Sequence, residues 1–210
     1  MASYKKTEQN TDFIIRELEN RFPARFSDGK AAFPAPLLIA IDGRCASGKT
    51  TLARELGTEL ERRSGSSVAV FHMDDFYLRP EQRTKERYAE PGGNVDRERF
   101  LSEVLLPLSR GEAFAYRPLI CPAMELGAPV CVERPDIAIV EGSYSQHPDL
   151  RGYMDLTVFL TLPPAVQRKR ILARNGVEKL AVFIERWIPL EEKYFSSLGV
   201  EKAADIVLGG

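Results

Sequence analysis

A phosphate-binding motif is the clearest chemical signal in the sequence. Residues 43–50 read Gly-Arg-Cys-Ala-Ser-Gly-Lys-Thr and satisfy the pattern G-x-x-x-x-G-K-[ST]. Its glycines let the backbone curl so that N–H groups point inward, and the positive end of a following helix adds to the attraction for phosphate oxygens. Lys49 suits the β- and γ-phosphates of ATP, and the Thr50 hydroxyl suits Mg²⁺. The predicted nucleotide-binding residues are Gly43, Cys45, Ala46, Ser47, Gly48, Lys49, Thr50 and Thr51.

Acidic residues follow two other apolar runs. Asp74 and Asp75 come shortly after residues 68–71, and Glu141 follows residues 137–140. In a parallel sheet, ligands gather outside the carboxyl ends of the strands. A hydroxyl that attacks a γ-phosphate needs a carboxylate to take its proton. Neighbouring residues of an extended chain face opposite ways, so we expect only one aspartate to face the substrate and choose Asp74.

Glu141 is the predicted partner of Thr50 in binding Mg²⁺. A strand-terminal acid can instead be a helix cap or a loop anchor, and Asp74 with Asp75 can be a solvated turn. Asp42, just before the motif, has two interpretations that the sequence leaves open. It either orients the magnesium shell or caps the backbone of the loop.

Arg170 and Arg174 lie four residues apart on a predicted helix and therefore share a face. Guanidinium groups can bind the peripheral oxygens of a transferring phosphoryl group. The alternative is a solvated basic face. Together these residues predict a kinase in which Lys49, Asp74, Arg170 and Arg174 act in catalysis. We interpret Cys45 as a small filler residue of the loop and Trp187 as a core residue.

Apolar runs alternate with helical patterns along the chain. Strands are predicted at residues 37–41, 68–71, 137–140, 156–160 and 206–208, and helices at residues 48–63, 97–110, 164–174 and 177–195. This order predicts an α/β P-loop NTPase fold, with a parallel sheet covered by helices on both faces, in a single domain of residues 1–210.

Three segments depart from this alternation. Residues 1–35 are predicted to form a helix that starts at Thr11 or Asp12, followed by a loop that contains Gly29. Residues 113–133, rich in proline and glycine, are expected to form a hairpin beside the substrate. Residues 168–180 are expected to form a short lid.

The composition argues against several classes of partner. The formal net charge is -1, which predicts no binding to nucleic acid or to a membrane surface. No apolar stretch reaches the roughly 20 residues that span a bilayer. The three cysteines are scattered, and the first ten residues are polar, so we expect a cytoplasmic protein without disulfides or a signal peptide. The expected partner is a small-molecule acceptor, and assembly into a homo-oligomer stays open.

Taken together, the motifs resemble the uridine kinase family, the nucleoside kinases related to phosphoribulokinase and pantothenate kinase. Asp74-Asp75-Phe76-Tyr77 is similar to the family's Asp-x-Phe-Tyr segment, whose first aspartate is the catalytic base. Asn94-Val95-Asp96 resembles the stretch in which an aspartate binds the ribose hydroxyls. Residues 170–175 resemble the lid. By this resemblance, the substrate-binding residues are Asp74, Tyr77, Asp96 and Tyr116.

The sequence departs from the family in the hairpin that recognises the base. Family members carry Tyr-Asp-Phe and then a histidine there, whereas Arg117 follows Tyr116 in this chain and the histidine is missing. The resemblance as a whole implies a nucleoside acceptor such as uridine or cytidine. Because of the departure in this hairpin, pantothenate, nicotinamide riboside or a sugar are alternatives. A nucleotide-binding regulatory module that has lost turnover is an alternative of a different class.

Overall fold

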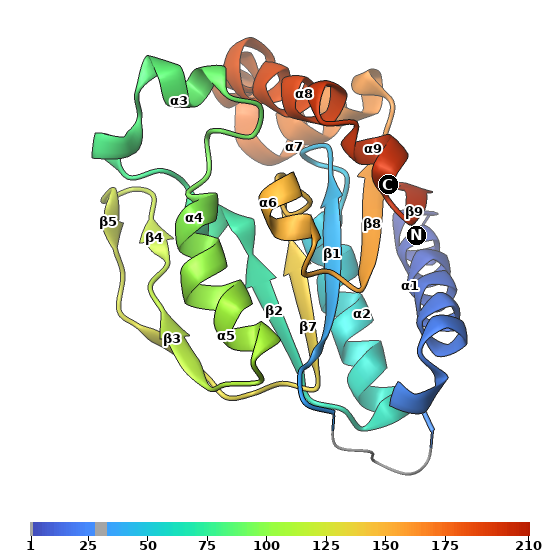
Figure 1. The fold of residues 1–210 in the computed structure, drawn as a ribbon. Helices are drawn as coiled ribbons and strands as arrows, with labels where there is room; N and C mark the ends of the chain where they lie inside the picture. The colour runs from blue at the N-terminus through green and yellow to red at the C-terminus, as the bar shows by residue number, and fades with distance from the viewer. Residues whose placement is uncertain (1, 28–32) are drawn as a thin grey trace.

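Five parallel strands form the central sheet of the computed structural model, which describes residues 2–27 and 33–210 (Figure 1). Across the sheet the order is β2-β7-β1-β8-β9. The strands are β1 (Leu37–Gly43), β2 (Val68–His72), β7 (Ile137–Glu141), β8 (Leu156–Thr161) and β9 (Ile206–Gly209). All five predicted strands are confirmed, as is their parallel arrangement.

Helices cover both faces of this sheet. On one face, α1 (Ala2–Arg21) and α2 (Lys49–Ser64) bury an aliphatic cluster that includes Leu18 and Leu56. On the other, α4 (Arg97–Phe100), a π-helical turn (Leu101–Leu105) and α5 (Leu106–Ser109) bury a second cluster. Residues of β1 alternate between the two clusters because successive side chains of a strand point to opposite faces.

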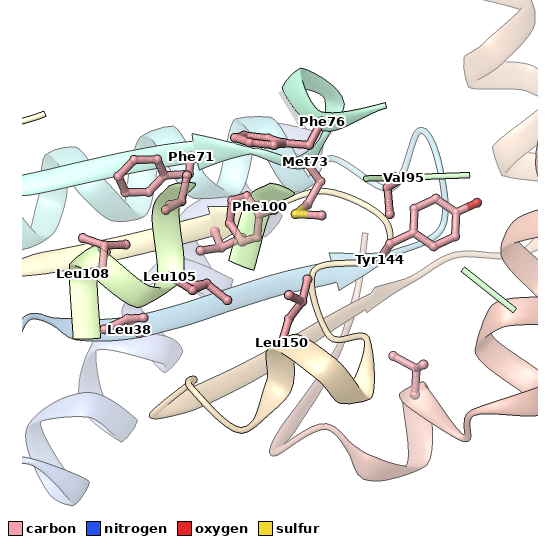
Figure 2. Packing of buried hydrophobic residues seen from close by; sticks show 14 of the residues in the cluster. Leu38, Phe71, Met73, Phe76, Val95, Phe100, Leu105, Leu108, Tyr144 and Leu150 are labelled. Atoms are coloured by element: carbon pink, nitrogen blue, oxygen red, sulfur yellow. The ribbon is translucent and has the colours of Figure 1, made fainter. Parts of the chain in front are cut away.

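The second cluster holds the turn Met73–Phe76, which follows β2, in place. Figure 2 shows Phe71 and Phe76 on one side of this cluster and Leu38 of β1 with Leu150 on the other. The rings of Phe76 and Phe100 meet edge to face with centroids 4.9 Å apart, which is a favoured aromatic geometry. Asp74 and Tyr77, which lie two residues before and one residue after Phe76, are thereby tied to the core.

The first helix differs from its prediction. It starts at Ala2 rather than at Thr11 or Asp12, and Thr11 is buried within it, so the predicted cap is wrong. Residues 2–10 contain neither proline nor glycine, and nothing in them stops the helix from extending toward the N-terminus. A short 3₁₀ helix (Pro23–Arg25) follows, and Gly29 of the predicted loop lies outside the described residues.

The two predicted late helices are observed as the two parts of a long helical arm. It consists of α7 (Pro164–Val182), a π-helical turn (Phe183–Trp187) and α8 (Ile188–Ser197), with α9 (Val200–Ala203) after it. The arm is interrupted at Gly176, whose φ of 81° and ψ of 173° are not helical. The break thus lies where the sequence separates the two predicted helices, inside the segment predicted as a lid.

The excursion at residues 113–133 is a nested hairpin, as predicted. Strand β3 (Phe114–Tyr116) pairs with β6 (Val130–Val132), and β4 (Leu119–Ile120) pairs with β5 (Glu125–Leu126). Phe114 stacks on Phe71 of β2, which places the hairpin beside the edge of the main sheet.

The remaining elements are short. They are the 3₁₀ turns Met73–Phe76 and Pro80–Gln82, α3 (Lys85–Ala89) and α6 (Pro148–Arg151). Among the described helices, none combines the length and the apolar character needed to cross a bilayer.

Truncating Phe100 tests the second cluster. Phe100→Ala should lower the free energy of unfolding by about 3–5 kcal/mol, because the ring is fully buried and its removal leaves a cavity in the core. Phe13→Ala is the control: Phe13 is 39% exposed on α1, and its loss should cost under about 1 kcal/mol. Urea unfolding of both variants measures this, and equal losses would contradict the assignment of the core.

Candidate active site

The phosphate loop joins β1 to α2 in the geometry that its sequence predicts. Gly43 has φ of 137°, and a Cβ there would lie 2.1 Å from the carbonyl oxygen of Leu160. Gly48 has φ of 100° and caps the N-terminus of α2, where the unpaired backbone N–H groups attract anions. Both glycines are therefore needed for backbone reasons alone.

A cavity of about 910 Å³ opens from this loop. Its wall includes most residues predicted to act in catalysis or to bind nucleotide, metal or substrate. They are Cys45, Ala46, Gly48, Lys49, Thr50, Thr51, Asp74, Tyr77, Glu141, Arg170 and Arg174. Segments that are distant in sequence thus meet at the carboxyl ends of the strands, as expected for parallel α/β folds.

Thr50 and Glu141 meet at the cavity wall. The Thr50 hydroxyl donates to Glu141 Oε1 at 3.0 Å, and His72 Nδ1 lies 2.6 Å from the same oxygen. The hydrogen bond with Glu141 raises the pKa of His72. Mg²⁺ prefers oxygen ligands and keeps several waters or phosphate oxygens in its shell, so one hydroxyl and one carboxylate suit it. The two residues predicted to bind metal are therefore placed together in a way that fits the ion.

The Lys49 ammonium lies against the start of the loop. It donates to the carbonyl oxygens of Gly43 at 2.7 Å and of Arg44 at 3.1 Å, and it lies 3.3 Å from the Ser143 hydroxyl. These contacts hold the charge beside the cavity, where the motif predicts a phosphate ligand.

Asp74 and not Asp75 lines the cavity, although the reason given from sequence is wrong. The two residues lie in the 3₁₀ turn Met73–Phe76 rather than in an extended strand. The Tyr77 hydroxyl donates to Asp74 Oδ1 at 2.9 Å. Asp75 is half-buried and hydrogen-bonds with Tyr116, and burial raises its pKa. The turn therefore separates the two carboxylates.

Arg170 and Arg174 of α7 both line the cavity, and Arg170 contacts the phosphate loop. Arg170 donates to the carbonyl oxygen of Ala46 at 3.1 Å. Arg174 is exposed, and its guanidinium donates to Asn175 Oδ1 at 2.8 Å. Both line the cavity, so the shared face predicted from their spacing is observed.

Asp96 and Tyr116 do not line the cavity. Asp96 is 3% exposed; its Oδ1 accepts the Arg99 N–H at 3.1 Å, and its Oδ2 accepts Gln82 Nε2 at 2.8 Å. Tyr116 stacks on Phe76 with ring centroids 5.5 Å apart. Both side chains make contacts within the fold, and their contacts with substrate stay predictions.

Asp42 anchors the backbone, the second of its two interpretations. The fully buried carboxylate accepts N–H groups of Gly43 at 2.6 Å, Tyr144 at 3.3 Å and Gln146 at 3.0 Å, and the Tyr194 hydroxyl at 2.8 Å. It thereby ties the entry of the phosphate loop to the segment after β7 and to α8.

Several cavity residues were missed or misread in the sequence. Trp187 is half-buried and lines the cavity with Phe183, so its interpretation as core is wrong. Glu191 and Ser143 also face the cavity, and no motif marked them. Trp187 and Glu191 are four residues apart, so a shared helical face was the one available signal.

Two residues singled out in the sequence, Arg117 and Cys45, can also be placed. Arg117 is exposed on the hairpin and donates to the carbonyl oxygen of Gly127 at 2.7 Å, away from the cavity. Cys45 is buried, and its burial raises the pKa of the thiol to about 12, which fits a filler residue rather than a reactive thiol.

Known proteins resemble this chain over most of its length. A uridine kinase from Leuconostoc citreum is 31% identical over 151 residues, covering 69% of this chain and 70% of the relative. A uridine kinase from Brevibacillus brevis is 28% identical over 152 residues, covering 69% and 68%. A search of protein-family models finds no match.

Among solved structures, one described as a possible uridine kinase from Bacillus stearothermophilus superposes with a TM-score of 0.68. The match covers 99% of this chain and 100% of that one at 24% identity. At this identity the likeness supports the fold.

Replacing Asp42 tests its role as the anchor. Asp42→Asn should lower the free energy of unfolding by about 2 kcal/mol or more, because an amide leaves at least one buried N–H donor unpaired. Tyr194→Phe removes one of the donors and should cost about 1 kcal/mol.

The same variant has an expected pH dependence. Burial raises the pKa of Asp42 to about 6, above its usual value of 3.8, so the folded chain binds the proton more tightly between these values. The stability advantage of wild type over Asp42→Asn should therefore be largest below about pH 4, shrink as the pH rises from about 4 to about 6, and stay constant above that range. Urea unfolding across this range measures it, and an advantage that grows with pH would contradict the assignment.

Proposed function

Because this chain belongs to the uridine kinase family of P-loop kinases, we propose that it transfers the γ-phosphate of ATP to a hydroxyl group of a nucleoside. One observation carries the proposal: the phosphate loop and the Asp74 carboxylate line the same cavity. A donor on the loop and an acceptor beside Asp74 would share that space. The nucleoside part of the proposal rests on the relatives.

Asp74 is the group suited to take the acceptor's proton. The Tyr77 hydroxyl occupies Oδ1, which orients the carboxylate and leaves Oδ2 for the acceptor hydroxyl. As the proton passes to Asp74, the acceptor oxygen bonds to the γ-phosphorus, and the bond from phosphorus to the β–γ bridging oxygen breaks. ADP leaves with the electron pair of that bond.

The loop and the arginines supply the electrostatic part. Backbone N–H groups at the start of α2 and the Lys49 ammonium would hold the triphosphate. Thr50 and Glu141 would hold Mg²⁺, which neutralises charge on the β- and γ-phosphates when bound. Arg170 and Arg174 would cover the transferring group and exclude water, which otherwise competes with the acceptor.

Exchange of one carboxylate separates catalysis from nucleotide binding. Asp74→Asn should lower kcat by about 10²–10⁴-fold, the usual contribution of a general base, while the Kd of ATP changes by under about threefold. Asp75→Asn is the matched control, because its side chain points to Tyr116; its kcat should fall by under about tenfold. Steady-state kinetics and calorimetric titration measure the two quantities. A larger loss for Asp75→Asn than for Asp74→Asn would reverse the assignment.

A different acceptor is favoured by one feature of the cavity. The hairpin tip contributes Cys121 and Met124 to the wall, and Arg117 points elsewhere. The family uses carboxylate and imidazole groups against a pyrimidine, and neither Cys121 nor Met124 supplies one to the cavity wall. Pantothenate, nicotinamide riboside or a sugar would then be phosphorylated by the same chemistry.

A panel of acceptors with labelled ATP distinguishes these candidates. A nucleoside kinase should give kcat/KM for uridine or cytidine at least about tenfold above that for pantothenate or a sugar. The reverse order would move the assignment to the second class of acceptor. If every acceptor is inert and Asp74→Asn equals wild type, the chain is a nucleotide-binding regulatory module instead.

A further inference from the structure

A second buried carboxylate contacts the phosphate loop, and the proposed mechanism does not use it. Glu191 of α8 is 7% exposed and lines the cavity. Its Oε2 accepts the backbone N–H of Cys45 at 3.0 Å, and its Oε1 accepts the Ser143 hydroxyl at 2.9 Å. An acid in this place is costly, because burial disfavours its charge and the loop is built to attract other anions.

The bond to Cys45 fixes the peptide between Arg44 and Cys45. In a trans peptide the N–H and the preceding carbonyl point in opposite directions. While Glu191 holds the Cys45 N–H on the α8 side, the Arg44 carbonyl faces the loop interior. There it accepts Lys49 Nζ at 3.1 Å and the Ser47 N–H at 3.1 Å.

The hydrogen bond from Ser143 to Glu191 also links Glu191 to the Lys49 ammonium. The Ser143 hydroxyl lies 3.3 Å from Lys49 Nζ and 3.1 Å from the Gly43 carbonyl oxygen. Glu191 therefore acts on Lys49 through a peptide on one side and through a hydroxyl on the other.

Neighbouring side chains hold α8 against the same stretch of chain. Glu192 pairs with the Arg44 guanidinium at 2.7 Å, and the Tyr194 hydroxyl donates to Asp42 at 2.8 Å. The arm that carries Glu191 is thus held at two other points near the loop, so its carboxylate approaches the loop from a fixed position.

We propose that Glu191 is a positioning residue for phosphoryl transfer, which orients the Arg44–Cys45 peptide and the Ser143 hydroxyl so that Lys49 meets the terminal phosphate of ATP. The inference rests on the proposed function, since it assigns Lys49 to that phosphate. The role requires a hydrogen-bond acceptor at Cys45 and does not require charge. A glutamine can fill it: its amide oxygen accepts the Cys45 N–H, and its NH₂ donates to Ser143, whose hydroxyl then donates to Gly43.

Three variants test the proposal: Glu191→Ala, Glu191→Gln and the control Glu185→Ala, which removes an exposed glutamate from the same arm. Calorimetry measures the binding of ADP and of the nonhydrolysable ATP analogue 5′-adenylyl imidodiphosphate. Steady-state kinetics measure kcat with the best acceptor of the panel. In Glu191→Ala, the Kd of the analogue should rise at least about tenfold and kcat should fall at least about thirtyfold. The Kd of ADP should rise at least about threefold less than that of the analogue, because ADP has only the β-phosphate for Lys49 to bind. Glu191→Gln and Glu185→Ala should stay within about threefold of wild type in all three.

Three results would overturn the proposal. Glu191→Ala could bind the analogue like wild type, Glu191→Gln could be as impaired as Glu191→Ala, or Glu191→Ala could lose ADP and the analogue equally, which indicates a collapsed loop. If wild type itself phosphorylates no acceptor, the proposed function fails, and the ratio of the two binding constants still decides the role of Glu191.

Discussion

The register of three neighbouring parallel strands is the constraint on which the site depends. Strand β7 lies between β2 and β1, and its last residue, Glu141, pairs with His72 on one side and with Ile41 on the other. This pairing ends the strands at a common edge, so that Thr50 and His72 both reach the Glu141 carboxylate. A slip of one residue would turn Glu141 to the other face of the sheet and separate these groups. All residues of β1 and β7 are buried, as is typical of central strands in a parallel sheet that is covered on both faces.

The other side of the cavity is built by a single helical arm. From α7 it supplies Arg170 and Arg174, from the π-helical turn Phe183 and Trp187, and from α8 Glu191. The same arm carries Tyr194, whose hydroxyl binds the buried Asp42 at the entry of the phosphate loop. Contacts with the loop therefore lie at both ends of the arm, while Gly176 interrupts the helix between them. The geometry couples the wall that would cover the phosphates to the backbone that would hold them.

Local patterns in the sequence predicted the parts that depend on local physics. Strand positions followed from apolar runs, and the phosphate loop followed from glycines that are required at positive φ. Asp74 lines the cavity, as the sequence predicted, but its position depends on a 3₁₀ turn that the sequence pattern did not reveal. Trp187 and Glu191 were not found because helical spacing defines a face without telling what the face meets. Asp96 and Tyr116 were carried over from the family, and here they cap α4 and stack in the core.

The central claim is that the last phosphate of a nucleotide on the loop lies beside the Asp74 carboxylate. A crystal structure with 5′-adenylyl imidodiphosphate, Mg²⁺ and the preferred acceptor tests it most directly. The account predicts the acceptor hydroxyl about 3 Å from Asp74 Oδ2 and in line with the terminal phosphorus. A terminal phosphate that points away from Asp74, or an acceptor hydroxyl bound to another group, would contradict it.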